Sequence, residues 1–145
     1  MTFEELVKEK GYSISFESII EPRTNDVKLR IIVNKSENPT DLLIFPHPDS
    51  KVQTLQIDFK NYVTYSVIYM VYTVENSTEI ADGDAFQIYG KSNYYDFIQR
   101  ETVLNTFFPN DKLIHYSLAC MEHKVDIISK HEPIITEIDP KTIKK

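Results

Sequence analysis

The stretch LQIDFK, residues 55–60, decides the fold class, because apolar Leu55, Ile57 and Phe59 alternate strictly with polar neighbours. Successive side chains of a β-strand point to opposite faces of its sheet, so this period of two predicts a strand with one buried face. Residues 62–74 follow, rich in β-branched and aromatic side chains and almost free of charge. They predict a central strand with both faces covered.

Segments of similar character lie on both sides of this pair. Further extended segments are expected at 12–20, 27–34, 42–45, 85–89, 113–120, 125–129 and 134–138. Two helices are expected: one after Thr2, which forms a capping box with Glu5, and one from Ser92 or Asn93 to about residue 108. Strands and helices do not alternate regularly. We therefore predict an α+β fold, a mostly antiparallel β-sheet packed by two α-helices in a single domain.

The composition fits one globular domain over residues 1–145, with a short polar tail at 139–145. Of the 145 residues, 41% are hydrophobic and 12% aromatic, which is enough for a packed core. The longest apolar run, residues 67–72, is far shorter than the roughly 20 residues that cross a bilayer. The N-terminus is acidic where a signal peptide would be basic, and the single cysteine, Cys120, cannot form an intramolecular disulfide. We expect a cytoplasmic protein with no membrane association.

The acidic charge balance argues against a nucleic-acid partner, and it is explained either by plain solubility, the commoner reason, or by a basic protein partner. The net charge is −6, so the basic face that neutralises phosphates is missing from the overall composition. Residues 75–84 are expected to form an exposed acidic loop without a basic residue, and eight of the nine tyrosines, a residue type enriched at protein interfaces, lie between residues 62 and 116. The candidate partner-binding residues are Glu75, Glu79, Asp82, Asp84, Tyr65 and Tyr69.

Cofactor and metal sites are not expected. The chain has only three glycines, all isolated, whereas a phosphate-binding loop needs several close together. His115, Cys120 and His123 cluster as metal ligands do, but His115 and Cys120 are separated by an odd number of residues and should face opposite sides of a strand. Only Cys120 and His123 could converge, and two ligands do not close a zinc site.

Catalytic residues are not expected either, although two arrangements stay open. Cys120 lies in an apolar stretch, where a thiol has a raised pKa and behaves as a small hydrophobic group. His115 could act as a base oriented by Asp126 across the predicted hairpin, if the register brings them together. The loop from His47 to Asp49 follows a predicted strand, a common place for functional groups, although its two prolines also explain it as a stiff turn.

The second half of the chain resembles a group of small bacterial proteins, some of which are similar to the immunity partners of secreted or contact-delivered toxins. The resemblance rests on FQIYGKS at 86–92, YYDFI at 94–98, LIHYSL at 113–118, VDIIS at 125–129 and EPI at 132–134. It implies a cytosolic binder without catalytic activity, and it assigns no functional residue.

The first hypothesis is therefore a non-enzymatic protein-binding domain, an immunity protein whose acidic surface meets the basic active site of a toxin. The alternatives are a small-ligand-binding or enzymatic domain that uses His47 and Asp49 or the His115 and Asp126 pair, and a structural or oligomerisation module. The identity of the partner, the strand order and the oligomeric state do not follow from the sequence.

Overall fold

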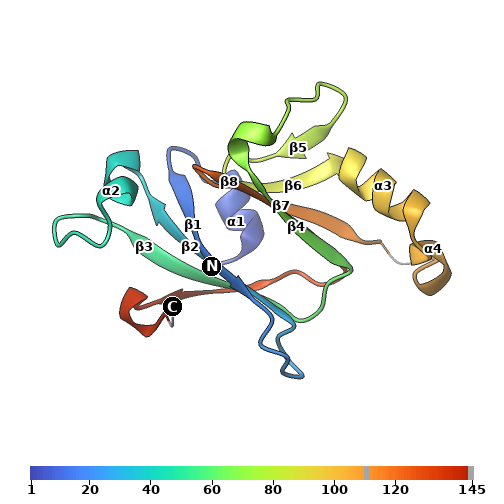
Figure 1. Ribbon diagram of the computed structural model, residues 1–145, viewed down its shortest axis with the longest axis horizontal. Coiled ribbons are helices and arrows are strands. Elements are labelled where there is room, and N and C mark those ends of the chain that lie inside the picture. The colour runs from blue at the N-terminus through green and yellow to red at the C-terminus, as the bar shows by residue number, and fades with distance from the viewer. Residues whose placement is uncertain (110–111, 144–145) are drawn as a thin grey trace.

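The computed structural model describes residues 1–109 and 112–143, and it contains two antiparallel sheets (Figure 1). Sheet A has the strand order β1-β2-β3-β9, and sheet B has the order β4-β8-β7-β6-β5. The strands of sheet A are β1 (Ser13–Ile20), β2 (Leu29–Ser36), β3 (Gln53–Phe59) and β9 (Ile134–Ile138). The strands of sheet B are β4 (Thr64–Tyr69), β8 (His123–Ser129), β7 (Ile114–Ala119), β6 (Phe86–Lys91) and β5 (Ile80–Asp82). The predicted α+β class with mostly antiparallel strands is confirmed.

The main core lies between the inner faces of the two sheets, so the domain has two sheets where one was expected. Ile57 of β3 and Ile127 of β8 belong to one buried cluster and are fully buried. Helix α1 (Phe3–Lys8) adds Phe3, whose ring lies 5.1 Å from Phe86 and 4.9 Å from Tyr116. The burial of these alternating apolar residues is the main source of stability.

A second, smaller core covers part of the outer face of sheet B. Helices α3 (Asn93–Glu101) and α4 (Leu104–Phe107) lie there, with Ile98 and Leu104 packed against Ile128 of β8. The predicted start at Ser92 is confirmed, but the single helix to residue 108 is wrong. The chain is extended at Thr102, whose hydroxyl donates to the Ile98 carbonyl at 2.6 Å and accepts from Leu104 N–H. These bonds end one helix and begin the next, as capping residues do.

One predicted strand is wrong, and another is shorter than predicted and lies elsewhere in its sheet. Residues 42–45 are predicted to be extended, but residues 42–44 belong to helix α2 (Pro39–Ile44), which Asn38 caps through a bond from Thr40 N–H at 3.0 Å; only Phe45, after the helix, is extended. The uncharged run 62–74 was expected to be a central strand. It forms only β4, at the edge of sheet B, followed by a 3₁₀ turn, η1 (Met70–Tyr72). The β-branched and aromatic residues of this run indicate a strand, but they do not indicate whether other strands lie on both of its sides.

The remaining differences are small. The predicted half-buried strand at 27–34 is β2, which is buried at most positions on both of its faces. The predicted loop 75–84 contains the short edge strand β5. In the tail, residues 140–142 form a second 3₁₀ turn, η2, and residues 144–145 lie outside the described part of the chain.

Candidate functional site

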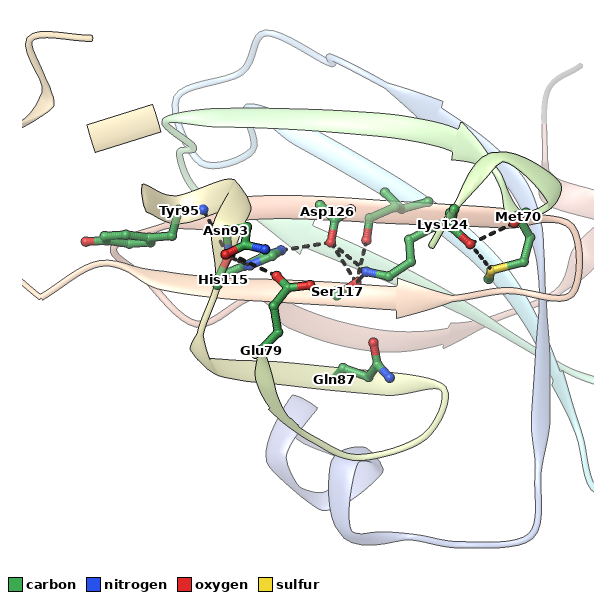
Figure 2. A network of polar contacts seen from close by, with 12 residues as sticks. Met70, Glu79, Gln87, Asn93, Tyr95, His115, Ser117, Lys124 and Asp126 are labelled. Carbon is green, nitrogen blue, oxygen red and sulfur yellow. Dashed lines mark hydrogen bonds and ion pairs between the residues drawn. The ribbon is translucent and has the colours of Figure 1, made fainter. Parts of the chain in front are cut away.

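Polar side chains form a connected network on the outer face of sheet B (Figure 2). The register places Ser117 of β7 opposite both Gln87 of β6 and Asp126 of β8, and Asp126 opposite Ser66 of β4. A polar row therefore crosses the sheet. Since side chains alternate along a strand, this row lies on the face opposite to the main core.

His115 is the centre of the network. Its Nδ1 lies 2.6 Å from Ser92 Oγ, and its Nε2 lies 2.8 Å from Asp126 Oδ1. The carboxylate can only accept, so Nε2 carries the proton of that bond. The imidazole is stacked on the Tyr89 ring at 4.3 Å with an interplanar angle of 12°, and only 3% of the residue is exposed. The orientation of the His115 ring is therefore fixed by hydrogen bonds at both nitrogens and by stacking of one ring face on Tyr89.

Asp126 and Lys124 form a mostly buried ion pair beside His115. Lys124 Nζ lies 2.9 Å from Asp126 Oδ1, 2.8 Å from Ser117 Oγ and 4.9 Å from the centre of the Tyr89 ring. Burial alone would raise the pKa of Asp126, but the His115 hydrogen bond and the Lys124 charge outweigh it and hold that pKa below its ordinary value. Burial is the largest single effect on Lys124 and would lower its pKa, but the Asp126 charge and the hydrogen bonds to Tyr89 and Asp126 together outweigh it, so the pKa is raised.

The contacts Ser92–His115–Asp126 have the order of a nucleophile, a base and an orienting group. A cavity of about 660 Å³ borders Ser92 and His115, and Lys91 and Tyr95 also line it. However, Ser92 Oγ also accepts from Tyr95 N–H at 2.9 Å, so it is the N-cap of α3, and only 5% of Ser92 is exposed. The geometry allows proton transfer from Ser92 to His115, while the cap and the burial restrict access to the hydroxyl.

Sequence reasoning named His115 and Asp126 as a conditional pair, and the structure brings them together. It missed three further members of the network, Ser92, Ser117 and Lys124. Ser92 carried a signal, because it was expected to cap the helix that follows β6. Ser117 and Lys124 carried none, since their contacts depend on the register of β7 and β8.

The four acidic candidates do not form one surface. The Glu79 carboxylate accepts from Asn93 N–H at 2.9 Å, at the start of α3. Asp84 pairs with Lys10 at 3.6 Å, and Asp82 borders the cavity described above. Glu75 is exposed and lies three residues after the end of η1. Of the four, Glu75 is therefore the nearest in the chain to the exposed side chains of Tyr69 and Tyr72.

The two candidate tyrosines lie in different surroundings. The Tyr65 hydroxyl donates to Glu21 at 3.2 Å, and Tyr62 donates to the same carboxylate. The hydrogen bond to Glu21 is the main reason that the pKa of Tyr62 is raised to about 12. Tyr69 is 59% exposed, and its ring lies 4.8 Å from the His123 ring. Tyr65 therefore joins β4 to the end of β1, and Tyr69 is open to solvent.

An exposed apolar segment begins in the middle of β4. Val71 and Val74 are both 84% exposed and Tyr72 is 76% exposed. Large side chains rarely remain so open in contiguous groups unless they bind something. The run of exposed apolar residues Val67, Ile68, Tyr69, Val71, Tyr72 and Val74 is called the apolar strip; within β4, Ile68 points to the opposite face of the sheet from Val67 and Tyr69.

A shallow hollow of about 350 Å³ lies at the η1 end of the apolar strip. Tyr69, Met70, Val71 and Met121 line it, together with the exposed Glu122. An apolar lining that includes one acidic residue, Glu122, suits a long side chain with a positively charged end.

The other candidates from the sequence do not assemble into sites. Cys120 is buried, and burial raises the pKa of its thiol to about 12. Within residues 1–109 and 112–143 no group of three or more potential ligands could hold a metal ion. His47 and Asp49 are exposed on a turn, where Asp49 N–H donates to His47 Nδ1 at 3.1 Å. Asp49 borders an open hollow next to Lys51, and His47 does not.

Over the residues that the structure describes, the chain is an α+β domain of two packed antiparallel sheets that carries a buried polar network and an exposed apolar strip. Comparison with known proteins finds no match among protein-family models, curated proteins or solved structures. Across the described residues, no helix has both the length and the apolar character needed to cross a membrane.

Proposed function

We propose that this chain is a non-enzymatic, cytosolic protein-binding domain, and that it acts as an immunity protein that blocks a toxin by direct contact. The observation that supports this function is the exposed apolar strip, above all Val71, Tyr72 and Val74. An isolated domain gains nothing from exposing these side chains, whereas a complex would remove them from water.

The acidic surroundings of the strip support a basic partner. Glu75 follows the strip directly and Glu122 borders its hollow, and both are exposed. Lys124, which lies opposite Ile68 of the strip in the neighbouring strand, is held in the network by Asp126 and Ser117, so it does not balance these charges at the surface. Such a surface would speed the encounter with a basic protein and would make the rate fall as salt rises.

The test is co-expression with the protein encoded by the neighbouring gene, followed by titration of the purified pair. We expect a dissociation constant below about 1 μM that weakens with salt. The variant Val71→Ser/Tyr72→Ser/Val74→Ser should lose most of this affinity. Phe107→Ser/Ile134→Ser is the control, because it removes two other apolar side chains that are 73% and 72% exposed. Equal loss of affinity in both variants, or no loss in either, would contradict the proposal.

Serine-dependent acyl transfer is the second candidate, and the Ser92–His115–Asp126 contacts favour it. Ser92 Oγ would attack a carbonyl carbon while its proton passes to His115 Nδ1, and the leaving oxygen would take up that proton before water releases the acyl group. A fluorophosphonate probe tests this, since it would label the wild type and not Ser92→Ala. An unlabelled wild type at millimolar probe would exclude this candidate.

A further inference from the structure

The free edge of β4 is the feature that defines how a partner would bind. Strand β4 pairs with β8 on one side and is the last strand of sheet B on the other. Met70 N–H donates to the Glu122 carbonyl at 2.8 Å, on the β8 side. Because backbone direction alternates in an antiparallel pair, Val67 and Tyr69 direct their N–H and C=O groups away from the sheet.

This edge lacks the usual protection against strand pairing. Natural edge strands carry charges, prolines or bulges that prevent addition of another strand. Strand β4 has the sequence TYSVIY and continues into MVY, without a charge or a proline, and its pairing with β8 is regular. Exposure rises along it, since the first half is partly covered by the Glu21 contacts and the second half is open.

We infer that β4 accepts an added β-strand from a basic partner segment, which pairs with residues 67–69 and places a lysine or arginine side chain in the hollow beside Glu122. This inference rests on the proposed function and specifies its binding mode. Main-chain hydrogen bonds would supply affinity, and alternate side chains would supply specificity. The aliphatic part of the basic side chain would cover Met70 and Met121, and its charge would meet the Glu122 carboxylate.

Charge argues for a basic partner over a second copy of the chain. Antiparallel pairing of two β4 strands would bring the Glu122 end of one copy towards the Glu21 end of the other. Like charges placed opposite each other destabilise strand pairs, and each copy carries a net charge of −6. A basic segment instead neutralises the carboxylate at the open end.

The probe is a nine-residue peptide in which valine alternates with lysine, labelled for fluorescence anisotropy. Two control peptides carry N-methyl groups on alternate residues or glutamate in place of lysine. We expect the lysine peptide to bind the wild-type chain at least tenfold more tightly than either control. Equal binding of the N-methylated peptide would overturn strand addition, and equal binding of the glutamate peptide would overturn the basic specificity.

Variants of the chain separate this mode from the proposed function. Val67→Pro removes an outward N–H while leaving the bonds to β8 in place, as edge positions tolerate; Val67→Thr keeps the N–H and is its control. We expect Val67→Pro, verified as folded by circular dichroism, to weaken peptide binding tenfold or more. If Val67→Pro binds the protein partner normally while the triple serine variant does not, strand addition is wrong and the proposed function stands. A wild-type dimer at micromolar concentration that Val67→Pro abolishes would overturn the basic partner in favour of self-pairing.

Discussion

The substitution Asp126→Asn tests whether the polar network stabilises the fold. The Asp126 carboxylate accepts from His115 Nε2 at 2.8 Å, from Lys124 Nζ at 2.9 Å and from Ser117 Oγ at 2.9 Å. Removing one charge of a buried ion pair costs about 3–5 kcal/mol, because the other charge stays buried without its partner. The Lys124 side chain is 18% exposed, and in the variant it would retain its contact with Ser117. We therefore expect a cost at the lower end of this range, about 3 kcal/mol.

The stability that Asp126 contributes should depend on pH in a defined direction. The folded pKa of Asp126 is lowered, so its contribution to stability is fully present above the ordinary aspartate pKa of about 3.9 and is lost as the pH falls through the folded pKa. The difference in unfolding free energy between wild type and Asp126→Asn should therefore be constant from about pH 5 to 8 and should shrink below about pH 4.

Urea unfolding followed by circular dichroism measures this difference, and the chain has no tryptophan to use instead. The melting temperature should fall by roughly 9 °C, at about 3 °C per kcal/mol for a domain of this size. Asp84→Asn is the matched control, because its pair with Lys10 is exposed at 3.6 Å and should contribute at most about 0.5 kcal/mol. The reasoning is refuted if the two variants cost the same, or if the difference is unchanged at pH 3.

Three further outcomes are expected. Ser92→Ala should destabilise the fold by about 1–2 kcal/mol in urea unfolding, since it removes the N-cap of α3, and Ser92→Thr should recover most of the loss; equal stability of all three chains would contradict the capping role. Gly83→Ala should cost about 3 kcal/mol or more in the same assay, because Gly83 has φ +95° and a Cβ atom there would lie 2.1 Å from the Phe86 carbonyl oxygen, whereas Gly90→Ala, with only ordinary contacts, should cost about 1 kcal/mol or less. Cys120 should react with Ellman's reagent at pH 8 only after unfolding, since burial raises the pKa of its thiol to about 12; rapid reaction of the native chain would contradict its burial.

The sequence predicted the strands whose alternation matches a single buried face. Residues 55–59 became β3, and residues 113–120 and 125–129 became the β7–β8 hairpin, because the period of two is determined locally. The sequence did not predict the two-sheet arrangement. Strand β4 has the composition of a central strand, and its position at an edge depends on which distant segments pair with it.

For the candidate site, the sequence indicated which residues could take part but not which of them are in contact. The pairing of His115 with Asp126 was conditional on register, and the observed register places Ser117, next but one along β7, directly opposite Asp126. The exposed strip was misjudged, since its uncharged residues suggested burial on both faces. Burial is a property of the assembled fold, and a run of apolar residues is compatible with a core or with a binding surface.

The contacts of Glu21 have a mechanical consequence. Glu21 follows β1 of sheet A, and its carboxylate accepts from Tyr62 and Tyr65 beside and within β4 of sheet B. Beside β1 and β4, sheets A and B are therefore joined by side-chain hydrogen bonds to a solvent-exposed carboxylate. Within each sheet, backbone hydrogen bonds join the strands. Side-chain hydrogen bonds at a solvent-exposed interface open at a lower free-energy cost than the backbone hydrogen bonds of a buried sheet. Local unfolding of the domain should begin with the separation of β1 from β4. Amide hydrogen exchange should therefore be faster in β4 than in β7 and β8.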